Sequence, residues 1–296
     1  MHILLFFVDG LGLGKNDPKI NPIKNLDFQC LNSLLEDKFC IPTDAQLDVE
    51  GLPQSATGQT AILTGINAAK AVGRHINGFP TKTLKKLIKE HSILKRLKDK
   101  ELKVTNANMY TKEYLARIWE YDNKINASAT TLATSAAQIP FRLLEDMLKG
   151  KAVYQDITNE LLIKRGFDVP LRTPHQAGKI LAKLSAEYHF VLFEYFQTDL
   201  AGHSQDKNWC ISVLRNLNDM LEGLMTNIDF KDSLLIFTSD HGNIEDISVS
   251  THTNNKVPTV FKGRNADRIA IKIRSITDLA SGIEVLLSGE SDKIDI

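Results

Sequence analysis

Residues 2–14 read HILLFFVDGLGLG, an unbroken apolar run that ends in Asp9 and three glycines. A run that is apolar at every position suits a strand covered on both faces, which is typical of the central strands of a mostly parallel sheet. Asp9 would then lie at the carboxyl end of the strand, where α/β sheets bind ligands. The glycine spacing does not match the GxGxxG pattern of dinucleotide folds. Asp before Gly is also a common turn pair, so Asp9 alone does not distinguish a ligand site from a turn.

Two later runs are largely apolar, and polar side chains follow both of them. FVLFEYF at 190–196 precedes TDLAGH, and LLIFT within 233–238 precedes SDHGN. Asp199 and His203 stand four residues apart, so on a helical turn both would face the same side. The acidic and histidine residues that follow the two runs are Asp199, His203, Asp240 and His241.

A last short strand is expected at VPTVF, with His252 in the loop ahead of it. Because the carboxyl ends of parallel strands share one edge of a sheet, we expect the aspartates and histidines to converge there. Converged carboxylates repel one another and have raised pKa values unless a cation neutralises them. Carboxylate and neutral imidazole together suit Zn²⁺ or Mn²⁺. The sequence thus predicts a metal centre built from Asp9, Asp199, His203, Asp240, His241 and His252.

The stretch GLPQSATGQTAILTG at 51–65 predicts a loop that delivers a hydroxyl to the start of a helix. Unpaired backbone N–H groups and the helix dipole favour an anion at such a position, including a developing oxyanion. Ser55 is therefore a candidate nucleophile, and Thr57 competes with it. The structural alternative is that Ser55 only caps the helix, since Ser is a favoured N-cap residue.

A polar, glycine-rich stretch at 66–80 carries Arg74, His75 and Asn77. A loop there would place hydrogen-bond donors on a substrate anion, with Arg as the natural bidentate partner, although a solvated turn would look the same. Residues 84–97 have apolar side chains at helical spacing, interleaved with Lys, and predict one amphipathic helix. Its basic face is interpreted as solvated and not as a nucleic-acid patch.

Residues 110–174 are less regular than the rest of the chain, with short helices expected around 133–137, 141–148 and 157–164. We interpret this segment as a small inserted cap or lid, and residues 1–109 and 175–296 as the α/β core. Arginines in or beside a lid are candidate substrate clamps, although chance would also place three in a segment of this length. They are Arg117, Arg142 and Arg172.

The composition is that of an ordinary globular protein of 296 residues, 43% of them hydrophobic. Lys plus Arg equals Asp plus Glu at 36 each, so no charge imbalance points to nucleic acid or to an anionic membrane as a partner. Three cysteines without CxxC spacing argue against a disulfide framework or a zinc ribbon. No run of about 20 apolar residues and no signal-peptide core occurs. We therefore expect a soluble, cytoplasmic protein.

Five motifs, taken in order, resemble the alkaline phosphatase superfamily of two-metal enzymes. They are VDG at Asp9, QSATGQTAILTG at Ser55, TDLAGH at Asp199 and His203, SDHGN at Asp240 and His241, and THTNNKVP at His252. Within that superfamily the pattern is most similar to the cofactor-independent phosphoglycerate mutases and the phosphopentomutases. The resemblance implies a three-layer αβα fold with a mostly parallel central sheet, and a small phosphorylated substrate as the partner.

The resemblance also implies two divalent metal ions, Mn²⁺ or Zn²⁺, with Mg²⁺ as a further option. Asp199, His203 and His252 would hold one ion. Asp9, Asp240 and His241 would hold the other together with the Ser55 hydroxyl. Two such ions about 4 Å apart lower the pKa of a hydroxyl and stabilise an in-line phosphoryl transfer. Ser55, which stands three residues before Gly58 as the mutase serine stands before its glycine, would accept the phosphoryl group.

Three departures from the family patterns bear on the reaction. The xPxR sequence that follows the sulfatase nucleophile is absent after Ser55, and Gln59 replaces a histidine of the mutases. Only roughly 65 to 75 residues are left for a cap, much less than the mutases have. A small cap protects a phosphoenzyme from water poorly, which favours hydrolysis. The alternatives are a phosphomutase of the phosphoglycerate or phosphopentose type and a non-catalytic metal- or phosphate-binding relative.

Overall fold

The computed structural model describes residues 1–25, 28–119 and 126–289. One six-stranded sheet has the order β2-β6-β5-β1-β4-β3. Strands β5, β1, β4 and β3 are parallel, while β6 and β2 run antiparallel to their neighbours. The strands are β1 His2–Val8, β2 Cys40–Thr43, β3 Val104–Asn106, β4 Phe190–Tyr195, β5 Ser233–Ser239 and β6 Val257–Gly263.

Strand β1 is the centre of the sheet, as the apolar run predicts. It pairs in parallel with β4 on one side and β5 on the other, and its side chains from Ile3 to Val8 are fully buried. Ile3, Leu5 and Phe7 belong to the hydrophobic core on one face of the sheet, and the residues between them belong to the core on the other face. This alternation is the two-residue period of a strand covered on both sides.

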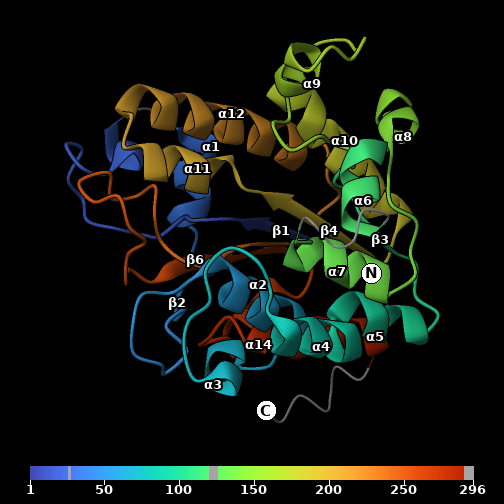
Figure 1. The fold of residues 1–296 in the computed structure, drawn as a ribbon, viewed down its shortest axis with the longest axis horizontal. Helices are drawn as coiled ribbons and strands as arrows, with labels where there is room; N and C mark the ends of the chain where they lie inside the picture. The colour runs from blue at the N-terminus through green and yellow to red at the C-terminus, as the bar shows by residue number, and fades with distance from the viewer. Residues whose placement is uncertain (26–27, 120–125, 290–296) are drawn as a thin grey trace.

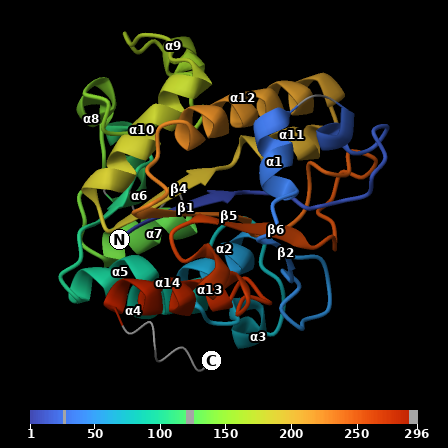
Figure 2. The same ribbon diagram turned by 180° about the vertical axis from the view of Figure 1, so that it is seen from behind.

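Helices cover both faces of the sheet (Figures 1 and 2). Helices α2, α4, α5, α7, α13 and α14 contribute to the core on one face, and α1, α10 and α12 to the core on the other. The three-layer αβα fold with a mostly parallel sheet is confirmed. The helices are η1 Pro22–Asn25, α1 Gln29–Leu35, α2 Ser55–Thr64, α3 Ala68–Val72, α4 Lys82–His91, α5 Ile93–Asp99, α6 Lys112–Trp119, α7 Ala129–Ala136, α8 Leu144–Leu148, α9 Glu160–Lys164, α10 Pro174–Glu187, α11 Gln197–Ser204, α12 Lys207–Met225, α13 Ala266–Ala270 and α14 Asp278–Ser288.

The antiparallel direction of β6 explains how His252 joins the other expected ligands. His252 precedes β6, whereas Asp9, Asp199 and Asp240 follow their strands. Because β6 runs opposite to β5, its start lies at the edge where the parallel strands end. All of these residues therefore reach the same edge of the sheet.

The single helix predicted over 84–97 is wrong, because Ser92 divides it into α4 and α5. Ser92 has non-helical dihedral angles (φ −59°, ψ 139°) and flanks both helices, in keeping with the preference of Ser for helix ends. The helix expected over 157–164 begins only at Glu160. Ile157 and Asn159 have positive φ angles (58° and 70°), which a helix does not accommodate.

Two further boundaries in the 110–174 segment differ from expectation. Helix α7 begins at Ala129, earlier than expected, because the Ser128 side chain caps it by accepting from the backbone N–H of Thr131. Helix α8 is shorter than the predicted 141–148 and begins at Leu144. Within the described ranges, no helix combines the length and the apolar character that a membrane span requires.

Candidate active site

Ser55 does not cap its own helix, so that structural alternative is wrong. Gln54, with extended dihedral angles, occupies the N-cap position of α2, and Ser55 is the first helical residue. The Ser55 hydroxyl lies 3.0 Å from Nε2 of His241 instead. The start of α2 therefore directs this hydroxyl toward the loop that follows β5.

Thr57, the competing hydroxyl, is buried and has local partners. Its Oγ1 donates to the backbone carbonyl of Gln54 at 3.0 Å and accepts from the backbone N–H of Ile76 at 3.3 Å. Thr57 therefore helps to hold the loop after α3 against the start of α2.

Asp9, Asp240 and His241 form one group of metal-type ligands, with atoms within 4.8 Å of one another. Nε2 of His241 lies 3.0 Å from Oδ1 of Asp9 and 3.7 Å from Oδ2 of Asp240. All three residues are buried, and Gln59 donates to the other carboxylate oxygen of Asp9 at 3.0 Å. The position where the mutase pattern has a histidine thus holds an amide that orients Asp9.

Asp199, His203 and His252 form the second group that the sequence predicts. Asp199 Oδ2 lies 3.4 Å from Nε2 of His203, and its Oδ1 lies 3.4 Å from Nε2 of His252. The two imidazole Nε2 atoms are 3.1 Å apart. Helix α11 carries Asp199 and His203 on adjacent turns, as their spacing predicts.

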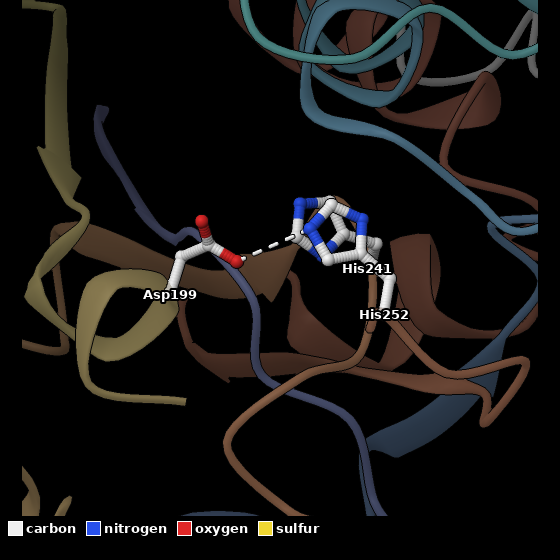
Figure 3. A group of neighbouring side chains, drawn as sticks. All are labelled: Asp199, His241 and His252. Carbon is white, nitrogen blue, oxygen red and sulfur yellow. Dashed lines mark ion pairs between the residues drawn. The ribbon is translucent and has the colours of Figure 1, made fainter. Parts of the chain in front are cut away.

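The two groups meet where His241 lies beside His252 and Asp199 (Figure 3). The rings of His241 and His252 stack with their centroids 3.7 Å apart. Ligand atoms of Asp199, His241 and His252 also lie within 4.8 Å of one another. His241 therefore stands at the boundary between the two groups, and all six predicted ligands are brought together.

Each of the three imidazoles is oriented by a backbone carbonyl at Nδ1. The partners are the carbonyl of Gly242 for His241 at 3.3 Å, that of Ser250 for His203 at 2.9 Å, and that of Pro53 for His252 at 2.8 Å. An Nδ1–H that donates to a carbonyl leaves the Nε2 lone pair free, which is the usual arrangement around a metal-binding histidine.

The ionisation states also favour a cation. Burial and repulsion from Asp240 raise the pKa of Asp9 well above its ordinary value, and burial raises the pKa of Asp240 as well. Burial alone would lower the pKa of His241, but the carboxylates of Asp240 and Asp9 outweigh it and raise the pKa to about 10. The metal-free chain thus takes up protons where a divalent cation would otherwise balance the carboxylates.

The donor set fits divalent metal ions. Within the described part of the chain, Asp9 Oδ1 and Asp240 Oδ2 are buried carboxylate oxygens whose contacts with His241 Nε2, at 3.0 Å and 3.7 Å, lack hydrogen-bond geometry. Such atoms are costly to bury unless they have a partner. Carboxylates and imidazoles with free Nε2 atoms suit Zn²⁺ and Mn²⁺.

The three residues predicted to bind substrate are not all brought to the cavity beside Ser55. Asn77 lines the cavity that opens beside Ser55. Arg74 is exposed and is absent from the lining, and Nε2 of His75 lies 3.1 Å from the backbone carbonyl of Val49. Of the three residues, Asn77 alone therefore lines the cavity.

The cavity has a volume of about 450 Å³ and reaches from Asp9, Ser55 and Asp199 into the 110–174 segment. Of the arginines considered there, Arg142 and Arg172 are bound to backbone carbonyls of the segment itself, and Arg117 is exposed on α6. Arg165, for which no role was predicted from the sequence, lines the cavity. Arg165 directly follows α9, and no sequence motif around it predicts that it lines a cavity.

Glu194 also lines the cavity and was not anticipated. It lies in the buried strand β4, and its carboxylate accepts from the hydroxyl of Thr130. Burial raises its pKa to about 7. A single acidic residue within the apolar run FVLFEYF is the sequence signal that would have identified it.

Glu245 ties together the loops that carry the predicted ligands. Its buried carboxylate accepts from the backbone N–H groups of Gly12 at 2.8 Å and Asn243 at 2.7 Å, from the Thr253 hydroxyl, and from the Asn255 amide at 3.0 Å. A Cβ atom at Gly12 would come within 2.3 Å of this carboxylate. Glu245 thus fixes the loops after β1 and β5 and before β6 relative to one another.

Comparison with known proteins places this site in a family. The pattern of the Metalloenzyme superfamily matches residues 1–284. A 2,3-bisphosphoglycerate-independent phosphoglycerate mutase of Methylobacillus flagellatus is 27% identical over 113 residues, which is 36% of this chain and 22% of the mutase. A mutase of the same type from Francisella tularensis subsp. novicida is 25% identical over 119 residues, 37% of this chain and 23% of that protein.

Solved structures share the fold along nearly the whole chain. The PH0037 protein from Pyrococcus horikoshii has a TM-score of 0.61 at 15% identity, covering 100% of this chain and 98% of that one. Alkaline phosphatase from the Antarctic bacterium TAB5 has a TM-score of 0.50 at 14% identity, covering 97% of both chains. Because the family pattern spans almost the full sequence, this chain belongs to the Metalloenzyme superfamily.

Proposed function

We propose that this chain is a metal-dependent phosphoryl-transfer enzyme that hydrolyses a small phosphorylated metabolite through a phosphoserine at Ser55. The observation that carries the proposal is the position of the Ser55 hydroxyl, 3.0 Å from His241 Nε2, which in turn lies 3.0 Å from Asp9. A serine that capped the helix would accept from a backbone N–H of its first turn. The hydroxyl instead faces a buried group of metal-type ligands.

Two divalent ions supply the electrophilic chemistry when bound, by lowering the pKa of the serine hydroxyl and by neutralising phosphoryl oxygens. Asp9, Asp240 and His241 would hold one ion with Ser55, and Asp199, His203 and His252 the other. Membership of the Metalloenzyme superfamily and the buried carboxylate oxygens without donors support this assignment.

The residues of the chain have defined roles in the proposed reaction. Ser55 Oγ loses its proton to water and forms a bond to phosphorus, while the ester oxygen leaves with the electron pair of the broken bond and takes a proton from water. Water then loses a proton as it attacks phosphorus, the bond from phosphorus to Ser55 Oγ breaks, Oγ takes up a proton, and phosphate is released. Because Ser55 is the first residue of α2, the unpaired N–H groups of this helix start lie near the transferred group.

We propose residues 110–174 as a small cap over the active site. The segment has its own hydrophobic cluster around Met147 and Tyr154, and it supplies Tyr154 and Arg165 to the cavity. Its helix α7 packs into the main core through Ala129 and Ala133. A cap joined to the core in this way gives limited protection from water, which supports hydrolysis.

The alternative is a phosphomutase of the phosphoglycerate or phosphopentose type, which the similarity to phosphoglycerate mutases favours. Turnover in ¹⁸O-labelled water distinguishes the two reactions. Hydrolysis puts the label into released phosphate, whereas intramolecular transfer gives an unlabelled isomeric phosphate ester. The second result would replace the hydrolase proposal with the mutase.

The other alternative is a relative that binds metal or phosphate without catalysis. The test is chelation of the protein followed by addition of Mn²⁺ or Zn²⁺, with release of phosphate from p-nitrophenyl phosphate as the readout. Restored turnover that is absent from the Ser55→Ala variant supports the enzyme. Two bound ions without turnover of any phosphate ester would support the non-catalytic alternative.

A further inference from the structure

The walls of the cavity beside Ser55 combine aromatic and apolar side chains with uncharged polar ones such as Asn77, Ser128 and Gln155. Large side chains from four separate parts of the chain line it: Phe79, Tyr110, Tyr114, Tyr154, Phe196 and Leu200. A cavity of about 450 Å³ is within the range of sites that enclose a whole organic ligand and exceeds what a phosphate group alone requires. The walls therefore face the alcohol part of a substrate whose phosphate lies at Ser55.

Two of the aromatic walls are fixed in place through their hydroxyl groups. The Tyr110 hydroxyl accepts from the Asn106 side chain at 3.0 Å, and its ring packs edge-on against Phe141 with the centroids 5.0 Å apart. The Tyr154 hydroxyl accepts from the Arg165 guanidinium at 2.9 Å. With the hydroxyls engaged, the ring surfaces are the parts that these residues offer to a ligand, and rigid rings bind at low entropic cost.

The mouth of the cavity exposes two large apolar side chains. Phe79 is 46% exposed and Leu200 is 45% exposed, although side chains of this kind are usually buried. Leu200 directly follows Asp199, so the apolar rim begins next to a proposed metal ligand. Exposed apolar side chains that gather at a cavity indicate a surface that a ligand covers.

Few charged groups face this part of the cavity. Apart from Asp9 and Asp199, the acidic and basic side chains of its described lining are Glu194 and Arg165. The Arg165 guanidinium donates to Tyr154 and lies 5.5 Å from the ring centroid of Phe167. Among the described lining residues, a second phosphate or carboxylate on the substrate would therefore meet one cation that already has partners, beside a buried acid.

We infer that the substrate is a phosphate monoester whose alcohol part carries an uncharged, flat ring that packs against Tyr110, Tyr154 and Phe79. The inference rests on the proposed phosphoryl transfer at Ser55 and specifies its substrate class. Small esters that carry a second anionic group, such as phosphoglycerate, are disfavoured by the same walls.

The experiment compares alkyl phosphates with similar leaving groups, so that intrinsic reactivity does not decide the result. The metal-loaded protein is given 2-phenylethyl phosphate, glycerol 2-phosphate or 3-phosphoglycerate, and kcat/KM is measured from phosphate release. We expect the ring-bearing ester to be preferred by about ten-fold or more, the scale of burying one aromatic ring. Equal or reversed preference would overturn the inference and leave the phosphatase standing. No turnover of any ester would instead contradict the proposed function.

Two variants of Phe79 test whether the cavity wall causes the preference for the ring-bearing ester. The ratio to compare is kcat/KM for 2-phenylethyl phosphate divided by kcat/KM for glycerol 2-phosphate. Phe79→Ala should lower this ratio several-fold, whereas Phe79→Tyr, which keeps the ring, should retain it. Ile271→Ala, which truncates a more exposed apolar side chain that does not line the cavity, should leave the ratio unchanged. A ratio that is the same in Phe79→Ala as in the wild type would contradict the assignment.

Discussion

The hydroxyl of Ser55 and the imidazole of His241 lie 3.0 Å apart although 186 residues separate them in the chain. Gly58, one turn into α2, permits this approach. A Cβ atom at Gly58 would come within 2.7 Å of the backbone carbonyl oxygen of Asp240. The start of α2 thus packs directly on the loop after β5, and the contact sets the position of the proposed nucleophile relative to the proposed ligands.

Replacing His252 should empty one metal site and leave the other filled. His252→Ala removes a ligand from the group with Asp199 and His203, while Asp9, Asp240 and His241 keep their positions on other loops. Metal analysis after dialysis should give about one ion per chain, against about two for the wild type. His91→Ala, a change at an exposed histidine of α4, is the matched control. Two retained ions in His252→Ala would refute the division of ligands.

Replacing Glu245 should loosen the three loops that it joins. Glu245→Ala leaves the N–H groups of Gly12 and Asn243 buried without their acceptor, so unfolding in denaturant should require about 2–4 kcal/mol less free energy in chelated protein. Metal affinity should fall as well, because the ligands sit on the same loops. Asp246→Ala is the control, since Asp246 accepts from its neighbour Ser248 at the surface. A variant as stable as Asp246→Ala would show that Glu245 does not hold the loops.

Glu194 should make stability depend on pH in the metal-free protein. Folding raises its pKa from 4.5 to about 7 because the carboxylate is buried. The folded state therefore favours the protonated carboxyl group of Glu194. Its contribution to the free energy of unfolding is complete below about pH 4.5 and is lost as the pH rises through about 7.

The matched change is Glu194→Gln, whose amide oxygen still accepts from Thr130. It should be more stable than the wild type above pH 7, by up to about 3 kcal/mol, and the difference should vanish toward pH 4.5. Denaturant unfolding of chelated protein across this range measures it, with the exposed Glu187→Gln as control. A stability difference that does not change with pH would contradict the raised pKa.

The sheet and the convergence of the ligands were predictable because they follow from local patterns. The apolar run before Asp9 specifies a strand covered on both faces, and the four-residue spacing of Asp199 and His203 specifies one side of a helix. His252 was placed correctly even though β6 is antiparallel, because an antiparallel strand begins where its parallel neighbours end.

What could not be predicted depends on contacts between distant parts of the chain. Ser55 and Thr57 look alike in sequence, and only the packing of α2 gives one hydroxyl to His241 and the other to Gln54. Arg142 and Arg165 both lie in the 110–174 segment, yet the fold of its short helices turns Arg142 to a backbone carbonyl and places Arg165 at the cavity. Single-residue properties do not distinguish members of such pairs.

The proposed reaction depends on a phosphoserine at Ser55, which can be trapped during turnover. Metal-loaded protein is mixed with a turned-over phosphate ester, quenched in acid, digested and analysed by mass spectrometry. We expect phosphate on the peptide that carries Ser55, none in Ser55→Ala despite retained metal, and undiminished labelling of Ser55 in Thr57→Ala. Phosphate on Thr57, or full turnover by Ser55→Ala, would contradict the account.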